Sequence, residues 1–191
     1  LNTTFHRGSS GITFNIAQSD LDNSINWIME NNTFLQCTYT AGGSGINFAS
    51  GVQNFTIRNN TIDRCPVGIQ IRTNTTRSIL IANNTIINST VTSLNSMDGA
   101  SGLQGGVGIY INATDVNLTY NRFEGNNISI AVRLGGDKTL FYSNIFADKV
   151  LTAPNHYINT TAFVRSNFSS FGNFYGDAFN TSLQDVNGNG V

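Results

Sequence analysis

The sequence is poor in charged residues, which make up 11% of it, and it has only two lysines and a formal net charge of −1. Too few cations are present to bind nucleic acid or anionic lipid by displacing phosphate counterions. No apolar run reaches the roughly 18 residues that a membrane-spanning helix needs. We therefore expect neither a nucleic-acid partner nor a membrane span in this chain. It begins at Leu1 without Met or a signal-type apolar stretch, which predicts a mature or excised chain.

Asparagine is the commonest residue, with 28 copies beside 21 Thr, 19 Gly and 17 Ser. Such a polar composition can indicate disorder. A hydrophobic content of 39%, including 13 Phe, instead predicts a folded core, and the length allows one domain.

A short motif, Asn-Asn-Thr followed by an apolar residue, is repeated along the chain. Three copies begin at residues 31, 59 and 83, and two weaker copies begin at residues 120 and 143. The second position is always asparagine: Asn32, Asn60, Asn84, Asn121 and Asn144. The last two are 23 residues apart, and the longer gaps fit the same unit with loop insertions. The sequence is therefore a tandem repeat.

A second motif, Gly-Ile-x-Ile or Gly-Ile-x-Phe, has the same period. Its copies begin at Gly11, Gly45, Gly68 and Gly108, with a variant from Ser129. In the segments before the repeated asparagines, apolar residues alternate with polar ones, as in Phe55-Thr56-Ile57. Alternation with a period of two in short segments between turns indicates β-strands. Such short strands bury an apolar face only by stacking on the next repeat.

These patterns predict an all-β fold, a right-handed parallel β-helix of about six to seven coils stacked about 4.8 Å apart. Like residues then stack on like. The recurrent asparagine forms a ladder at a tight turn, where it tolerates left-handed backbone geometry and bonds to the next asparagine. Glycine before each Ile-x-Ile segment supplies another corner. An antiparallel sandwich is the alternative, although hairpin turns require no constant asparagine column.

The Asn-Asn-Thr-Ile and Gly-Ile-x-Ile motifs resemble the parallel β-helix repeats of extracellular polysaccharide-active proteins. They are most similar to the periplasmic copper-binding-type family, the nitrous oxide reductase accessory β-helices, and to its relatives on archaeal cell surfaces. The segment from Gly172 to Asp177 resembles the Gly-Asn-Tyr-Trp-x-Asp segment that closes such domains. The resemblance implies the fold rather than one function, because such repeats carry unrelated activities. With only two His and two Met, a copper site is not expected.

We divide the chain into β-helix coils over residues 1–166 and a C-terminal cap or contact segment over residues 167–191, rich in aromatic residues, Gly and Asn. Aromatic residues of this segment are expected to cover the last coil, or alternatively to contact another subunit or a sugar. Tyr110 and Tyr142 are expected to point outward from strands. Both chain ends interrupt the repeat, which predicts that stacking continues into further sequence or another copy.

Cys37 and Cys65 are the only cysteines, and each follows a ladder asparagine by five residues. They therefore occupy the same position of adjacent coils, and the coil spacing lies within the Cα separation of a disulfide. We predict a Cys37–Cys65 bridge, which implies an oxidising, extracellular compartment. Two stacked free thiols are the alternative.

Thirteen Asn-x-Ser/Thr sequons are present, more than random placement explains. Those at Asn31, Asn59 and Asn83 lie within the ladder motif, so glycans on all three would crowd. The predicted glycosylation sites are instead Asn74, Asn88, Asn112 and Asn159, on loops and outer faces.

The last residues place Asp185, Asn187 and Asn189 at alternate positions before Gly190, as in the first half of a calcium-binding loop. The bidentate acid expected further along is absent, so another chain, a longer polypeptide or a backbone group would supply that ligand. The sequence predicts a candidate Ca²⁺ site, with an Asn/Gly-rich turn as the alternative.

Acidic residues are few and scattered. In the predicted register Asp63 and Glu124 share a column with Ile87 between them, about 10 Å apart. Glu30 and Arg58 lie side by side as a surface ion pair. No predicted coil carries two acids and a base together, which argues against an enzyme of the acid–base type.

The leading hypothesis is an extracellular structural or adhesive module at a cell surface, glycosylated and able to assemble into a filament or sheet. Its partners would be copies of itself or other cell-surface proteins, with a polysaccharide as a further candidate. The alternative is a polysaccharide lyase, epimerase or hydrolase, or a non-catalytic carbohydrate-binding β-helix. The active face of such an enzyme would contain Arg72, Arg133, Asp63 and Glu124 together with the long loop over residues 87–107.

Overall fold

A computed structural model describes residues 2–7, 11–15, 26–37, 43–73, 75–90, 106–132, 139–146, 156–158 and 169–171. These residues form the strands β1 to β18, with no helix among them, and therefore none of the long apolar helices that cross membranes. The strands belong to three sheets of six strands each, which we call sheets A, B and C.

Sheet A consists of β1 (Thr4–His6), β4 (Thr33–Leu35), β7 (Thr61–Asp63), β10 (Thr85–Ile87), β13 (Arg122–Glu124) and β16 (Ile145–Phe146). Sheet B consists of β2 (Ile12–Phe14), β5 (Ser44–Phe48), β8 (Val67–Ile71), β11 (Val107–Ile111), β14 (Ile128–Val132) and β17 (His156–Ile158). Sheet C consists of β3 (Trp27–Glu30), β6 (Gln53–Arg58), β9 (Arg77–Ala82), β12 (Thr114–Thr119), β15 (Leu140–Tyr142) and β18 (Ser169–Phe171).

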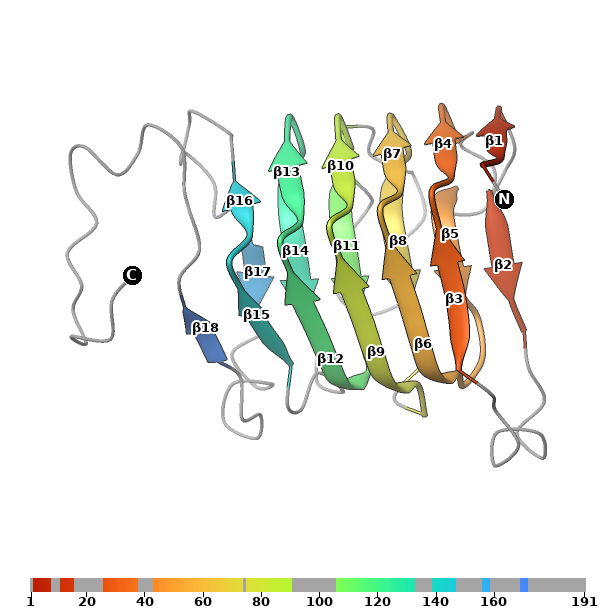
Figure 1. The fold of residues 1–191 in the computed structure, drawn as a ribbon. Helices are drawn as coiled ribbons and strands as arrows, with labels where there is room; N and C mark the ends of the chain where they lie inside the picture. Colours follow the sequence, from red (N-terminus) through yellow and green to blue (C-terminus); the bar gives the residue numbers. More distant parts are fainter. Residues whose placement is uncertain are drawn as a thin grey trace, which may run out of the picture.

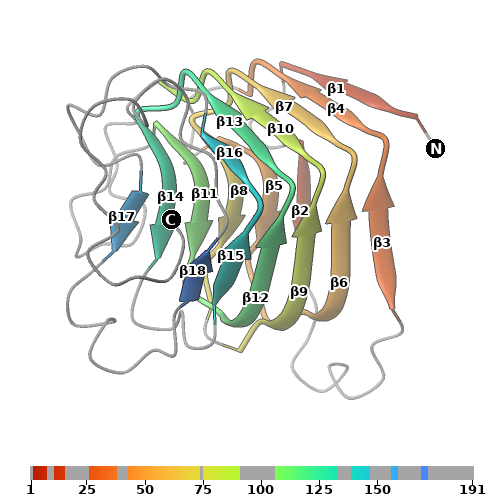
Figure 2. The same cartoon turned by 60° about the vertical axis from the view of Figure 1, so that its left-hand side comes forward.

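Each strand pairs in parallel with the strand three places earlier and the strand three places later, as β4 pairs with β1 and β7. One strand from each sheet therefore makes one coil, and six coils stack side by side (Figure 1). The three sheets form three faces around a common interior (Figure 2). The structure is thus the predicted parallel β-helix, and the antiparallel sandwich is excluded because every described pair is parallel.

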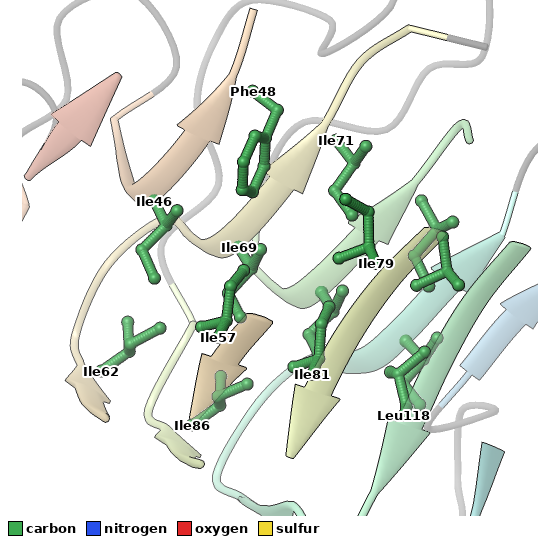
Figure 3. Packing of buried hydrophobic residues seen from close by; sticks show 14 of the residues in the cluster. Ile46, Phe48, Ile57, Ile62, Ile69, Ile71, Ile79, Ile81, Ile86 and Leu118 are labelled. Carbon is green, nitrogen blue, oxygen red and sulfur yellow. The ribbon is translucent and has the colours of Figure 1, made fainter. Parts of the chain in front are cut away.

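The interior is filled by columns of apolar side chains that repeat from coil to coil (Figure 3). In sheet A the column is Phe34, Ile62, Ile86, Phe123 and Phe146, each at most 1% exposed. Aromatic members stack face to face, with ring centroids 5.0 Å apart for Phe123 and Phe146. Each such side chain stabilises the fold by about 1.5–3 kcal/mol relative to exposure. The alternation read from the sequence therefore identifies the core.

The repeated glycines differ from their predicted role. Gly45, Gly68 and Gly108 lie inside strands of sheet B, and none of them is among the glycines with positive φ. A Cβ on Gly45 would lie 2.8 Å from both the carbonyl oxygen of Gly68 and Cγ2 of Ile62. These positions need glycine because the next coil and the core pack closely against them, not because the chain turns there.

The predicted boundary between residues 166 and 167 falls just before β18. This strand still pairs in parallel with β15, so the stacking continues to Phe171, inside the segment that we expected to be a cap. Residues 172–191 lie outside the described part of the chain.

Candidate functional site

The five ladder asparagines lie in register, and their side chains join the coils. Oδ1 of Asn60 accepts hydrogen bonds from the backbone N–H and Nδ2 of Asn32, at 2.9 and 3.1 Å. Oδ1 of Asn84 accepts the same pair from Asn60, both at 3.0 Å. Asn121 and Asn144 continue the pattern. The amides of the last four are at most 1% exposed, so these bonds satisfy polar groups that water does not reach.

The left-handed corner is one residue earlier than predicted. Asn31, Asn59 and Asn83 have φ of 59°, 56° and 54°, and Tyr120 and Ser143 have the same conformation in the two weaker copies. The ladder asparagines themselves are not in this region. The two roles that we predicted for one asparagine therefore belong to two neighbouring residues. The first turns the backbone, and the second forms hydrogen bonds to the adjacent coils.

Cys37 and Cys65 occupy equivalent turn positions with their Cα atoms 4.5 Å apart, at disulfide bonding distance. The next two coils place Ser89 and Asn126 at this position. Oδ1 of Asn126 accepts a hydrogen bond of 2.9 Å from the backbone N–H of Ser89, and its Nδ2 donates to the carbonyl of Ile86. This second ladder was not predicted, although the sequence carries its signal: Asn126 follows Asn121 by the same five residues.

Each carboxylate in the described part of the chain is held by a polar partner. Three form ion pairs: Glu30 with Arg58 at 2.6 Å, Asp63 with Arg64 at 2.8 Å, and Glu124 with Arg122 at 2.7 Å. The fourth, Asp115, accepts a hydrogen bond of 2.9 Å from Ser78. Asp63 also accepts one from Nδ2 of Asn88.

The two acids of the alternative active face do not meet. Ile87 pairs with Asp63 on one side and Glu124 on the other, as predicted. Arg72 is exposed, with no ion-pair partner among the described residues, while Arg133 lies outside them. The described residues thus bring together none of the four residues proposed for that face.

A buried polar row lies on the outer face of sheet B. Asn47, Gln70 and Tyr110, which pair in register on β5, β8 and β11, form this row. Gln70 is fully buried, and neither atom of its amide has a hydrogen-bond partner among the described residues, nor does Oδ1 of Asn47. Polar groups in this condition are costly in a fold and rare in structures.

Tyr110 does point to the outer face, where it packs with Val67, Val107 and Ala131, but it is not exposed as we expected. Its exposure is 1%, against the exposed surface that alternation predicts. Burial raises the pKa of Tyr110 to about 12, and the positive charge of Arg72 opposes this rise to a smaller extent. Tyr142 is half-buried.

Two of the four predicted glycosylation sites are described. Nδ2 of Asn88 donates to Asp63 and Nδ2 of Asn112 donates to the carbonyl of Arg72, both at 2.9 Å. Asn74 and Asn159 lie outside the described residues, and so do the calcium candidates Asp185, Asn187 and Asn189. Over the described ranges, His, Cys, Asp and Glu form no group of three that could hold a metal ion.

An apolar hollow of about 400 Å³ lies at the first described coil. Its apolar lining consists of Phe5, Ile12, Phe14, Trp27, Ile28, Met29 and Phe55. Trp27 is 49% exposed, whereas Phe55, its partner on the next coil, is 2% exposed. We call this surface the first-coil end.

The sequence matches the family described as "Right handed beta helix region" over residues 2–169. Searches of the curated proteins and of the solved structures gave no match. The narrower resemblance to nitrous oxide reductase accessory proteins and archaeal surface proteins stays a prediction. The family match spans most of the chain and agrees with three all-parallel stacked sheets. The chain therefore belongs to the right-handed β-helix family.

Proposed function

We propose that this chain is a structural, adhesive module of an extracellular or cell-surface assembly, in which copies stack end to end. The observation that carries the proposal is the first-coil end. Its aromatic side chains continue the columns of the core, with ring centroids 5.1 Å apart for Phe14 and Phe48 and 6.5 Å apart for Trp27 and Phe55. On its other side Trp27 remains about half exposed to water.

A second copy is the occupant that fits this surface. The strands β1, β2 and β3 are the outermost strands of the three sheets, so their outer backbone groups face no other described strand. Unpaired strand edges bind further strands, and a coil of the same fold offers three strands at the right spacing together with its own apolar interior. Such a contact would bury the apolar hollow and complete three sheets at once.

The chemistry of the carboxylates supports a structural role. The four described acids are engaged with Arg58, Arg64, Arg122 and Ser78 on the surface of the coils. Acid–base hydrolysis of glycans needs two carboxyl groups placed on either side of one bond. The cysteine pair supports an oxidising location, because disulfides persist mainly outside the cytosol.

Sedimentation velocity and electron microscopy over a range of concentrations test the proposal. We expect elongated assemblies that grow with concentration, and we expect Trp27→Glu to leave monomers with an unchanged circular dichroism spectrum. Leu80→Glu is the matched control, because Leu80 is also an exposed apolar residue but lies on the outer face in mid-stack. Monomers of the unmodified chain at all concentrations, or equal dissociation by both variants, would overturn the proposal.

Carbohydrate binding is a second candidate function, favoured by Arg72, an exposed cation that follows β8 and has no ion-pair partner among the described residues. An exposed guanidinium can bind the carboxylates of acidic sugars. Binding of polyuronates on a glycan array, without turnover and lost in Arg72→Ala, would support it. Turnover would instead indicate a lyase or hydrolase, and an absence of binding would remove this candidate.

A further inference from the structure

We propose that Asn31, Asn59 and Asn83 form a column of N-glycan attachment sites in which adjacent coils are not occupied together. The inference rests on the proposed extracellular function, because N-glycans are attached to proteins that are exported to the cell surface or beyond it. It reverses the preference drawn from sequence, which favoured loop sites over the ladder motif.

The three asparagines are exposed at the left-handed corner between sheets C and A, with φ between 54° and 59°. Among the described residues no hydrogen bond involves their side-chain amides, while their backbone N–H groups donate to the next coil, as Asn59 does to Ala82. The side chains therefore extend from the corner with Nδ2 free to react. A sugar added there displaces no contact of the fold.

The sites preferred from sequence have amides that already bind the protein. Nδ2 of Asn88 donates to Oδ1 of Asp63 and Nδ2 of Asn112 donates to the carbonyl of Arg72. Nδ2 of Asn127, in another sequon, donates to the carbonyl of Thr90. A sugar on these nitrogens would compete with that bond for the space around Nδ2.

The third residue of each sequon in the column is also accessible. Thr33, Thr61 and Thr85 pair in register on sheet A and are half-exposed. The middle residue of each of these sequons is a ladder asparagine that bonds within the stack. In two other sequons the hydroxyl residue is buried: Thr119, after Asn117, is 6% exposed, and Ser129, after Asn127, is fully buried.

The distance between adjacent coils limits which of the three asparagines can carry glycans in one molecule. Neighbouring corners are about 4.8 Å apart, less than the width of a pyranose ring with its substituents. Asn31 and Asn83 are two coils apart, about 10 Å, which leaves room for a glycan on each. Asn59 lies between them, so a glycan on Asn59 would clash with a glycan on either neighbour. The column therefore carries glycans on Asn31 and Asn83, or on Asn59 alone.

The reaction transfers a sugar from a lipid-linked glycosyl phosphate or pyrophosphate. Nδ2 forms a bond to the anomeric carbon, and the bond from that carbon to the phosphate oxygen breaks. The lipid phosphate leaves with the electron pair, and the amide proton passes to a base of the transferase. No oxidant or reductant is required.

Intact-mass and glycopeptide mass spectrometry of the protein from its native source test the inference. We expect glycans on Asn31 and Asn83 of the same molecules, without one on Asn59. The double variant Thr33→Ala/Thr85→Ala, which keeps all the corner asparagines, should raise occupancy at Asn59 several-fold. Glycans on Asn59 and Asn83 of one molecule, or none on the three, would overturn it.

Asn54 provides the matched control. It is also exposed and left-handed, with φ of 54°, and Thr56 of its sequon is half-buried. On the next coil, however, its counterpart is Ser78, which cannot carry an N-glycan. Thr56→Ala should therefore remove only the Asn54 glycan and leave glycan occupancy in the column unchanged. A change in that occupancy would contradict the explanation by steric clash between adjacent glycans. Electron microscopy of the same preparation measures end-to-end assembly independently of glycosylation. If one of the two proposals fails, the other can still be tested.

Discussion

Asn60 and Asn84 are joined by a side-chain hydrogen bond of 3.0 Å between adjacent coils, and both amides are 1% exposed. Nδ2 of Asn84 also donates to the carbonyls of Ile57 and Ala82. One side chain thus ties together segments that are more than 20 residues apart.

Removal of this amide should be costly, whereas its neighbour should tolerate the same change. We expect Asn84→Gly to lower the free energy of unfolding by about 2–4 kcal/mol, because several buried partners lose their bonds. Asn83→Gly should change it by less than about 0.5 kcal/mol, because glycine readily adopts the left-handed conformation of Asn83. Urea unfolding measures both, and equal losses would contradict the division of roles between the two positions.

The cysteine pair predicts a covalent link between the second and third coils. The unreduced, denatured protein should show no free thiol, and two titratable thiols would refute the bridge. The double variant Cys37→Ser/Cys65→Ser should lose about 2–4 kcal/mol of stability, since the bridge closes a loop of 28 residues. The unmodified protein under reducing conditions is the control and should lose a similar amount.

Gln70 is expected to be a site where an apolar residue stabilises the chain. Because both amide atoms are buried and have no partner in the described part of the chain, Gln70→Met should raise the melting temperature by about 2–4 °C, equivalent to about 1 kcal/mol. Gln70→Glu, which places a charge there, should lower it. A less stable Gln70→Met variant would mean that the amide has a bound partner in solution.

Tyr110 should make stability depend on pH in the alkaline range. Its folded pKa of about 12 exceeds the unfolded value of 10.0 because burial disfavours the phenolate. The folded state therefore holds its proton more tightly. The stabilisation is fully present below pH 10 and is lost as the pH rises toward 12, by about 1.4 kcal/mol per pH unit.

The comparison of the unmodified chain with Tyr110→Phe isolates this effect, because the other tyrosines are common to both. Unfolding measured at pH 9, 10 and 11 should show the unmodified chain losing stability relative to Tyr110→Phe as the pH rises. Parallel curves would show that Tyr110 ionises alike in the folded and unfolded states.

Repetition made the register predictable. The period placed Ile87 between Asp63 and Glu124, Glu30 beside Arg58, and Cys37 beside Cys65, because residues at equal offsets from the ladder asparagine stack on one another. The columns of the core follow from the same rule.

Features that depend on the third dimension across a coil were not predictable in this way. Local alternation places Tyr110 on the outer face but does not tell whether that face is covered. The need for glycine at Gly45 arises from Ile62, a residue of another sheet. The offset between the left-handed corner and the ladder was missed because two adjacent asparagines look alike in sequence and differ only in where their amides point.

The ladder also has a direction. At every step the amide nitrogen of one asparagine donates to the oxygen of the asparagine on the following coil, from Asn32 through to Asn144. The amide dipoles therefore add along the axis, with their oxygens toward the first coil, where Asn32 accepts a bond from the backbone of Thr3. A stack of such molecules would be a fibre with chemically unlike ends, and growth at those ends would proceed at unequal rates.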